Sequence, residues 1–447
     1  MAGRNSKNNQ GGRREQTPKQ GRGNARGHAW HHRKGGGGGR VTVREAPHGI
    51  ASGKDRTMEG TRRQGFMQLD DETLADLRSG EKRMEVERKI QEKGEAAEYG
   101  AELPGLRGRG TVIEVRRGNF LTRIESELPT EGDSIPRILR CVLRGTMQQF
   151  DMGLSSMVAP GDVVDLIVPP PPEEGALHSF EPHGILLRVE PRRSEFRRLH
   201  PSGRSIQTLA ANVDRVVMVA SCAEPDFRPG FVDRVWVCAA SSGLPMALVV
   251  NKIDLGIRAR DRELFDVYRG LGVPVFLTST TDAALRQGVA DAENSTGYEG
   301  FDALKNWMAG KRCVMTGHSG VGKSSLMLAL DPQLNPADVR TGDVSTQTGK
   351  GTHTTTHGRL FEIELSPGVR AELVDTPGVR EFTPAETDRQ NLWGWFPELA
   401  KLQGQCEYSD CTHINETGCA VLAAVERGEM HPRRHQSYVR LYETLPR

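Results

Sequence analysis

A glycine-rich stretch between a strand-like run and a helix-like run constrains the fold of this 447-residue chain more than any other feature. Residues 317–324 directly follow the apolar run 313–316 and precede the helical run 325–330. Glycines in such a loop let backbone N–H groups turn inward around phosphates, while a lysine reaches the β and γ oxygens and a serine hydroxyl binds magnesium. The residues expected to hold the nucleotide here are Gly317, His318, Ser319, Gly320, Val321, Gly322, Lys323, Ser324 and Ser325.

A second motif predicts which base is bound. Asn251, Lys252, Ile253 and Asp254 follow the apolar run 247–250, at the carboxyl end of a predicted parallel strand, where such sheets bind ligands. The Asp254 carboxylate can accept hydrogen bonds from N1 and N2 of guanine, which adenine cannot offer, while Asn251 can serve the O6 and N7 side. The motif therefore favours GTP over ATP. Further candidates for base contact, which are also ordinary turn residues, are Ser279 and Thr280.

Two more segments carry groups suited to magnesium and the γ-phosphate. Asp375 ends the apolar run 372–374, so its carboxylate can hold magnesium through water, and the Gly378 N–H can meet the γ-phosphate. Residues 351–356 are polar and rich in threonine, which is typical of a mobile loop that orders when a threonine hydroxyl joins the metal shell. Spacing does not identify the threonine that supplies the hydroxyl, and we favour Thr354 or Thr355.

These motifs run in a circularly permuted order, because the base-reading motif precedes the phosphate loop. With residues 211–214, the threonine-rich stretch and a C-terminal Cys/His cluster, the chain resembles the small-subunit-dependent ribosomal GTPases known as RsgA or YjeQ over residues 105–447. The resemblance implies an oligonucleotide-binding barrel, a permuted GTPase and a zinc module. It also implies GTP hydrolysis in late maturation of the small ribosomal subunit, with ribosomal RNA as partner and release after hydrolysis.

The group that orients the attacking water is not a glutamine after Gly378, because Val379 stands there. A hydrophobic side chain cannot position a nucleophile. The family resemblance implies that His353 is the catalytic group that orients the water. Lys323, which reaches the phosphates, is the other residue expected to act in catalysis. A polar loop would also carry such a histidine without any chemistry, so both interpretations stay open.

A Cys/His cluster near the C-terminus predicts a metal site. The spacing C-x4-C-x-H-x5-C offers three thiolates and one imidazole, which suits a closed tetrahedral zinc site. Four protein ligands leave no position for a reacting water, so we expect one structural zinc that stabilises a segment too small for its own core. The ligands are Cys406, Cys411, His413 and Cys419. The other cysteines fall in apolar patterns and are expected to be buried: Cys141, Cys222, Cys238 and Cys313.

Changes in composition and in the pattern of apolar residues divide the chain into four segments. Residues 1–100 combine a basic Gly/Arg-rich tail, expected to be disordered, with a charged stretch that fits a solvated helix. Residues 101–200 hold five short β-rich runs that fit a small OB-fold barrel. We assign residues 205–385 to the permuted α/β GTPase domain and residues 386–447 to a helical zinc module. The runs of the predicted barrel are 111–115, 120–124, 138–143, 163–168 and 185–189, and those of the GTPase sheet are 216–220, 247–250, 273–277, 313–316 and 372–374.

Charge and hydropathy indicate which binding partners and which cellular location to expect. Residues 1–40 hold ten Lys and Arg residues against the single acid Glu15, a pattern typical of arms that bind nucleic acid. We find no apolar run of the roughly 18 residues that a membrane span needs, and no secretory signal, so we expect a soluble, cytoplasmic monomer without a membrane partner. An organellar transit peptide is the competing interpretation of the Arg-rich start. Such peptides are rich in serine, however, and Ser6 is the only serine before Ser52.

Two other functions stay open at this point. An RNA-binding module whose GTPase has lost turnover would hydrolyse GTP at the background rate, with or without ribosomes. A permuted GTPase switch for a protein partner would lack salt-sensitive affinity for RNA.

Overall fold

The computed structural model describes residues 104–116, 118–125, 137–144, 157–170, 183–200, 205–281, 300–339, 358–376, 382–385 and 387–445. The predicted tail and charged helix of residues 1–100 lie outside this part of the chain. Within it, none of the helices is long and apolar enough to cross a membrane.

Five strands form a closed barrel. Their order is β1-β2-β3-β5-β4, and pairing of β1 with β4 closes the ring. Alternate side chains point inward, and Val112, Cys141 and Leu166 lie in the core that they form. The predicted OB-fold barrel is thereby confirmed as a fold. The strands are β1 (Leu106–Arg116), β2 (Asn119–Ile124), β3 (Ile138–Leu143), β4 (Val163–Val168) and β5 (His183–Val189).

A two-stranded antiparallel sheet follows the barrel in the chain, and our sequence analysis missed it. It consists of β6 (Glu195–Leu199) and β7 (Ile206–Ala211). Charged residues outnumber apolar ones in β6, so only Phe196 signals an inward face. That ring is fully buried and lies 5.8 Å from the ring of Phe382, which anchors the sheet to the next domain.

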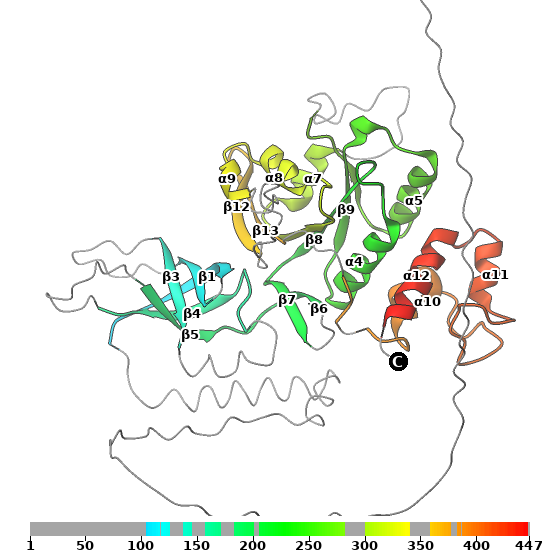
Figure 1. The fold of residues 1–447 in the computed structure, drawn as a ribbon, viewed down its shortest axis with the longest axis horizontal. Helices are drawn as coiled ribbons and strands as arrows, with labels where there is room; N and C mark the ends of the chain where they lie inside the picture. Colours follow the sequence, from blue (N-terminus) through cyan, green and yellow to red (C-terminus); the bar gives the residue numbers. More distant parts are fainter. Residues whose placement is uncertain are drawn as a thin grey trace, which may run out of the picture. The chain divides into compact units, whose positions relative to one another are not determined.

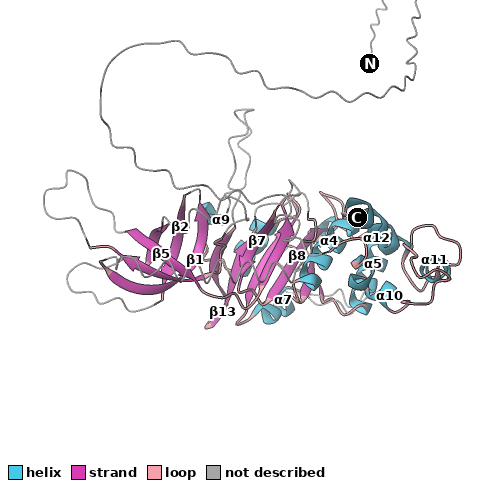
Figure 2. Cartoon of the chain, turned by 90° about the horizontal axis from the view of Figure 1, so that it is seen from below, coloured by secondary structure: helices cyan, strands magenta, loops and turns pink. Residues whose placement is uncertain are grey.

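The GTPase domain is built on a sheet in the order β10-β9-β8-β11-β13-β12. Neighbouring strands are parallel except β12, which is antiparallel to β13 and was not predicted. β1 of the barrel pairs with β12, so the strands continue from the barrel into this sheet (Figure 2). The strands are β8 (Arg215–Ser221), β9 (Met246–Asn251), β10 (Val275–Leu277), β11 (Arg312–Gly317), β12 (Arg359–Ser366) and β13 (Val369–Asp375).

Helices cover both faces of this sheet, which explains why its central strands are apolar on both sides. Along β8, Val216 and Met218 pack with one set of helices, and Val217 and Val219 pack with the other. Figure 1 shows both layers. The first layer contains α4 (Pro229–Ser241) and α5 (Ala259–Gly270), and the second contains α7 (Phe301–Met308), α8 (Lys323–Leu330) and the short α9 (Pro336–Val339).

The C-terminal segment is helical, as predicted, and it packs around an apolar cluster that it shares with Val237 of α4. Leu392, Phe396, Val421 and Leu441 are buried together there, and α12 lies against α4 of the GTPase domain (Figure 1). Its elements are η2 (Leu392–Trp395), α10 (Pro397–Ala400), α11 (Ala420–Glu426) and α12 (Pro432–Thr444).

Candidate nucleotide and metal sites

The predicted phosphate loop joins β11 directly to α8. Gly322 has φ +92°, and a Cβ atom there would lie 2.4 Å from Nδ2 of Asn251. A Cβ on Gly317 would lie 2.3 Å from the carbonyl oxygen of Val219. Both positions therefore require glycine. The loop ends at the first turn of α8, where free backbone N–H groups favour an anion.

Lys323, the first residue of α8, and Asp375, the last residue of β13, lie close enough for their charges to interact. The Lys323 ammonium donates to the carbonyl oxygens of Gly317, at 2.9 Å, and His318, at 3.2 Å. Burial lowers the pKa of Lys323 and raises the pKa of Asp375 to about 6, and each charge partly offsets the effect on the other. Both groups are thus poised to be stabilised by added charge, a phosphate for the lysine and a cation for the carboxylate.

A magnesium ion fits this arrangement. Oδ1 of Asp375 is buried and has no hydrogen-bond partner among the described residues. Ser324, the second residue of α8, has its hydroxyl 3.4 Å from the carbonyl oxygen of Val339, a weak contact that a metal could replace. Hard carboxylate and hydroxyl oxygens are the ligands that Mg²⁺ prefers, directly or through water. The donor set therefore agrees with the predicted metal chemistry.

Asn251 links the base-reading loop to the phosphate loop. Its amide is fully buried, with Nδ2 donating to the carbonyl oxygen of Val321, at 3.1 Å, and Oδ1 accepting from Thr278, at 3.2 Å. The sequence could not reveal this contact, because Val321 and Thr278 are remote from Asn251 along the chain. A contact of Asn251 with guanine O6 or N7 stays a prediction.

Asp254 lies in the same loop as an acceptor. Its Oδ1 accepts from the Ser279 hydroxyl at 2.6 Å. Partial desolvation raises its pKa, but hydrogen bonds from Ser279 and Thr281 outweigh that effect and hold the pKa below its ordinary value. The carboxylate is thus ionised, as guanine recognition requires. Ser279 therefore orients Asp254, and a contact of Ser279 or Thr280 with the base stays a prediction. Lys252 adopts a left-handed backbone conformation ahead of Ile253, which begins η1 (Ile253–Leu255).

The predicted metal ligands come together in the C-terminal segment. One ligand atom from each of Cys406, Cys411, His413 and Cys419 lies within 4.8 Å of the others. Nδ1 of His413 is 3.4 Å from Sγ of Cys406. Three soft sulfur ligands and an imidazole are compatible with a closed zinc site.

Glu416 shapes the loop that carries these ligands. Its carboxylate accepts backbone N–H bonds from Thr412, Ile414 and Asn415, at 2.8–3.1 Å. His435 adds a contact of 2.8 Å between its Nε2 and the carbonyl oxygen of His413. The loop thus has polar cross-links that hold its ligands in place, and Cys406, Cys411 and Cys419 also pack with the apolar cluster of the C-terminal segment.

Comparison with known proteins decides the family. The family model described as RsgA GTPase matches residues 189–384. Over 296 residues, which are 65% of this chain and 86% of the relative, the chain is 36% identical to the protein from Chlorobaculum parvum named small ribosomal subunit biogenesis GTPase RsgA. This chain belongs to the RsgA GTPase family. Members of the family are hydrolases acting on GTP, so the enzyme class expected from the phosphate and base motifs is confirmed.

Other RsgA proteins and a solved structure agree with this assignment. A protein of the same name from Chlorobaculum tepidum is 36% identical over 342 residues, 75% of this chain and 97% of the relative. The crystal structure of YjeQ from Thermotoga maritima is similar with a TM-score of 0.50 and 27% identity, and the match covers 76% of this chain and 98% of that one.

Several predicted residues of this RsgA-family chain lie outside the described residues. They are His353, Thr354, Thr355 and Gly378, together with Val379. Their roles stay predictions. The phosphate loop, Asn251, Asp254 and Asp375 are described, and they meet at the carboxyl edge of one sheet.

A groove of about 630 Å³ lies elsewhere, between the barrel and the opposite edge of the sheet. Arg109 and Arg193 line it from the barrel side, and Lys311 and Arg370 line it from the GTPase side. Because Lys311 stands before β11 and the phosphate loop follows that strand, the groove is not the nucleotide site.

Proposed function

We propose that this chain hydrolyses GTP during late maturation of the small ribosomal subunit. The observation that carries the proposal is that a phosphate loop, an ionised Asp254 and a buried Asp375 oxygen meet at one edge of the sheet, and that this oxygen has no hydrogen-bond partner in the described part of the chain. The name shared by the RsgA relatives supports the choice of the small subunit as partner.

Each residue has a distinct part in the proposed reaction. The backbone N–H groups of the phosphate loop and Lys323 bind the β- and γ-phosphates, and Asp254 binds guanine. Ser324, Asp375 and either Thr354 or Thr355 would hold Mg²⁺, which supplies charge neutralisation at the phosphates when bound. The Gly378 N–H contacts the γ-phosphate, and His353 orients the attacking water.

Ribosomal RNA is the proposed ligand of the barrel. Arg107 on β1 and Arg140 on β3 are exposed on its strands, and β2 with β3 forms the face that barrels of this type use for oligonucleotides. The basic arm of residues 1–40 would add contacts to phosphates. We further propose a cytoplasmic monomer without a membrane partner, in which one Zn²⁺ holds the cysteine and histidine loop together.

Turnover measured separately with small and large ribosomal subunits tests the proposal. Saturable stimulation by the small subunit alone is the expected result, with an affinity that falls as salt rises. Background hydrolysis at every subunit concentration, combined with GTP-dependent RNA binding, would instead identify an RNA-binding switch without turnover. Replacing His353 by alanine should abolish stimulation but leave GTP-dependent subunit binding intact.

A further inference from the structure

Two glutamates face each other in the hairpin that ends at Asp375. Glu362 on β12 and Glu372 on β13 are directly opposite in the register of the two strands. Like charges in this relation destabilise an antiparallel pair. β13 continues from Glu372 to Asp375, so a distortion of the hairpin at the glutamates would move the proposed magnesium ligand.

The barrel supplies the countercharge. Arg123 on β2 donates from Nη1 to Oε1 of Glu362, at 2.6 Å, and from Nη2 to Oε1 of Glu372, at 2.7 Å. Its side chain is 15% exposed, so water screens these bonds only partly. One arginine fork thus joins the two like charges, each by its own hydrogen bond.

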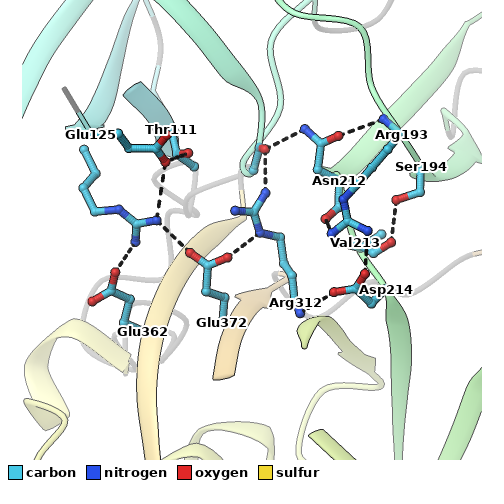
Figure 3. Close-up of polar contacts among 12 residues, drawn as sticks. Thr111, Glu125, Arg193, Ser194, Asn212, Val213, Asp214, Arg312, Glu362 and Glu372 are labelled. Atoms are coloured by element: carbon cyan, nitrogen blue, oxygen red, sulfur yellow. Dashed lines mark hydrogen bonds and ion pairs between the residues drawn. The ribbon is translucent and has the colours of Figure 1, made fainter. Parts of the chain in front are cut away.

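Arg312 on β11 neutralises only one of the two glutamates. Its Nε donates to Oε2 of Glu372 at 2.7 Å, as Figure 3 shows. Burial raises the pKa of Glu372, but the bonds from Arg312 and Arg123 outweigh it and lower that pKa. Among the described residues, Glu362 forms its ion pair with Arg123. Without Arg123, Glu362 would face an ionised Glu372 uncompensated.

A second connection reaches Asp375 through the backbone. Glu114 of β1 pairs with Arg359 of β12, and Arg359 pairs with Asp375 of β13. Glu114 of the barrel, Arg359 of the hairpin and Asp375 therefore lie in one row across three neighbouring strands. The barrel holds the hairpin both at this row and at the glutamate pair.

We propose that Arg123 is a positioning residue for GTP hydrolysis, which holds the β12–β13 hairpin from the barrel so that Asp375 lies correctly for magnesium. The inference rests on the proposed function, because it takes Asp375 as the magnesium ligand. Arg123 lies on β2 of the barrel and would act on the site through Glu362 and Glu372.

The experiment compares Arg123→Gln with Arg188→Gln. The second variant is a control that removes another ion pair of the barrel, in which Nη2 of Arg188 lies 2.7 Å from Oδ2 of Asp165. Binding of a fluorescent GDP is titrated with Mg²⁺, and amide hydrogen exchange is followed in residues 359–375 without metal. Arg123→Gln should raise the half-saturating Mg²⁺ concentration about fivefold and speed exchange in the hairpin. GDP affinity in EDTA should stay unchanged, because Asp254 and the phosphate loop lie on other strands. The control should match the parent protein.

A double variant separates positioning from loss of an ordinary ion pair. Adding Glu362→Gln to Arg123→Gln removes the repulsion and should restore most of the Mg²⁺ response. A double variant as impaired as the single one overturns the proposal, as does an unchanged Mg²⁺ response in Arg123→Gln or an equal loss in Arg188→Gln. If Arg123→Gln fails to fold, Arg123→Lys, which keeps the charge but cannot bridge both carboxylates, serves in the same comparison. A parent protein without Mg²⁺-dependent nucleotide binding would refute the proposed function instead.

Discussion

Arg434 is the residue whose loss should most disturb the attachment of the C-terminal segment. Its side chain is 1% exposed, and Nε and Nη2 donate to the two oxygens of Glu398 at 2.8 and 2.9 Å. Nη1 donates to Asp233 of α4. Burial opposes the charge of Arg434, but the two carboxylates outweigh it and raise the pKa of Arg434 above its ordinary range. The Arg434→Met substitution would leave both carboxylates buried without a countercharge.

The expected cost follows from that burial. Removing one partner of a buried ion pair costs about 3–5 kcal/mol, because the remaining charge is left desolvated. Asp233 is 1% exposed and Glu398 is 9% exposed, so water cannot replace the guanidinium without opening the interface. Arg427 provides a matched control, since it bonds Glu429 at 2.7 Å with both side chains more than half exposed. Arg427→Met should have no measurable effect.

Urea unfolding followed by tryptophan fluorescence measures the difference. Trp393 and Trp395 pack in the C-terminal apolar cluster, and the ring of Trp236 lies 5.0 Å from the guanidinium of Arg434. With a typical slope near 2 kcal/mol per molar urea, Arg434→Met should lower the midpoint of this transition by about 2 M. A shift no larger than that of Arg427→Met would refute the reasoning. Neutralising both carboxylates in the Arg434→Met background should recover much of the loss.

Four further outcomes are expected. Asp254→Asn should weaken GTP binding and admit xanthosine triphosphate in a competition assay, because an amide donor suits the extra carbonyl of xanthine. Lys323→Ala should abolish GTP hydrolysis without lowering the melting temperature, since the ammonium acts on phosphate. Cys411→Ala or zinc chelation should speed proteolysis of the cysteine and histidine loop yet preserve GTP affinity, which equilibrium binding would show. Glu372 has a lowered pKa, so its contribution to stability is full above pH 4.5 and is lost as the pH falls through the folded-state value. The urea midpoints of the parent and Glu372→Gln should therefore converge in acid.

The parts of the fold that local chemistry dictates could be predicted from sequence. The phosphate loop needs glycines and a lysine at fixed spacing, and the barrel strands are short β-rich runs between turns. β6 was missed because its charged residues hide a strand that only Phe196 anchors. β12 does carry a signal, since Phe361, Ile363 and Leu365 alternate, but it follows a polar stretch that was interpreted as a loop.

The contacts that position the site could not be predicted, because they join residues far apart in the sequence. The hydrogen bond from Asn251 to the Val321 carbonyl oxygen joins two loops, and neither motif contains a signal that predicts it. The same is true of Arg123, which looks like any surface arginine until β2 is placed beside β12 and β13. Spacing can identify the groups that bind a ligand, but not the second set of groups that orients them.

The permuted order explains why both flanking modules attach close to the phosphate-binding strand. β11 lies between β8, which the chain enters from the barrel through β7, and β13, from which it leaves toward the C-terminal segment. The entering and leaving segments also meet, because the Leu199 N–H donates to the Thr383 carbonyl oxygen at 2.7 Å.

The C-terminal segment then returns to the other side of the site. Arg434 binds Asp233 on α4, the helix that connects β8 to β9, and β9 ends at Asn251. The chain that leaves β13 is thus anchored beside β9. Because Arg434 binds Asp233 and Glu398 rather than the metal ligands, loss of zinc and loss of Arg434 should have separable effects. Loss of zinc should loosen only the loop, whereas loss of Arg434 should detach the whole segment from α4.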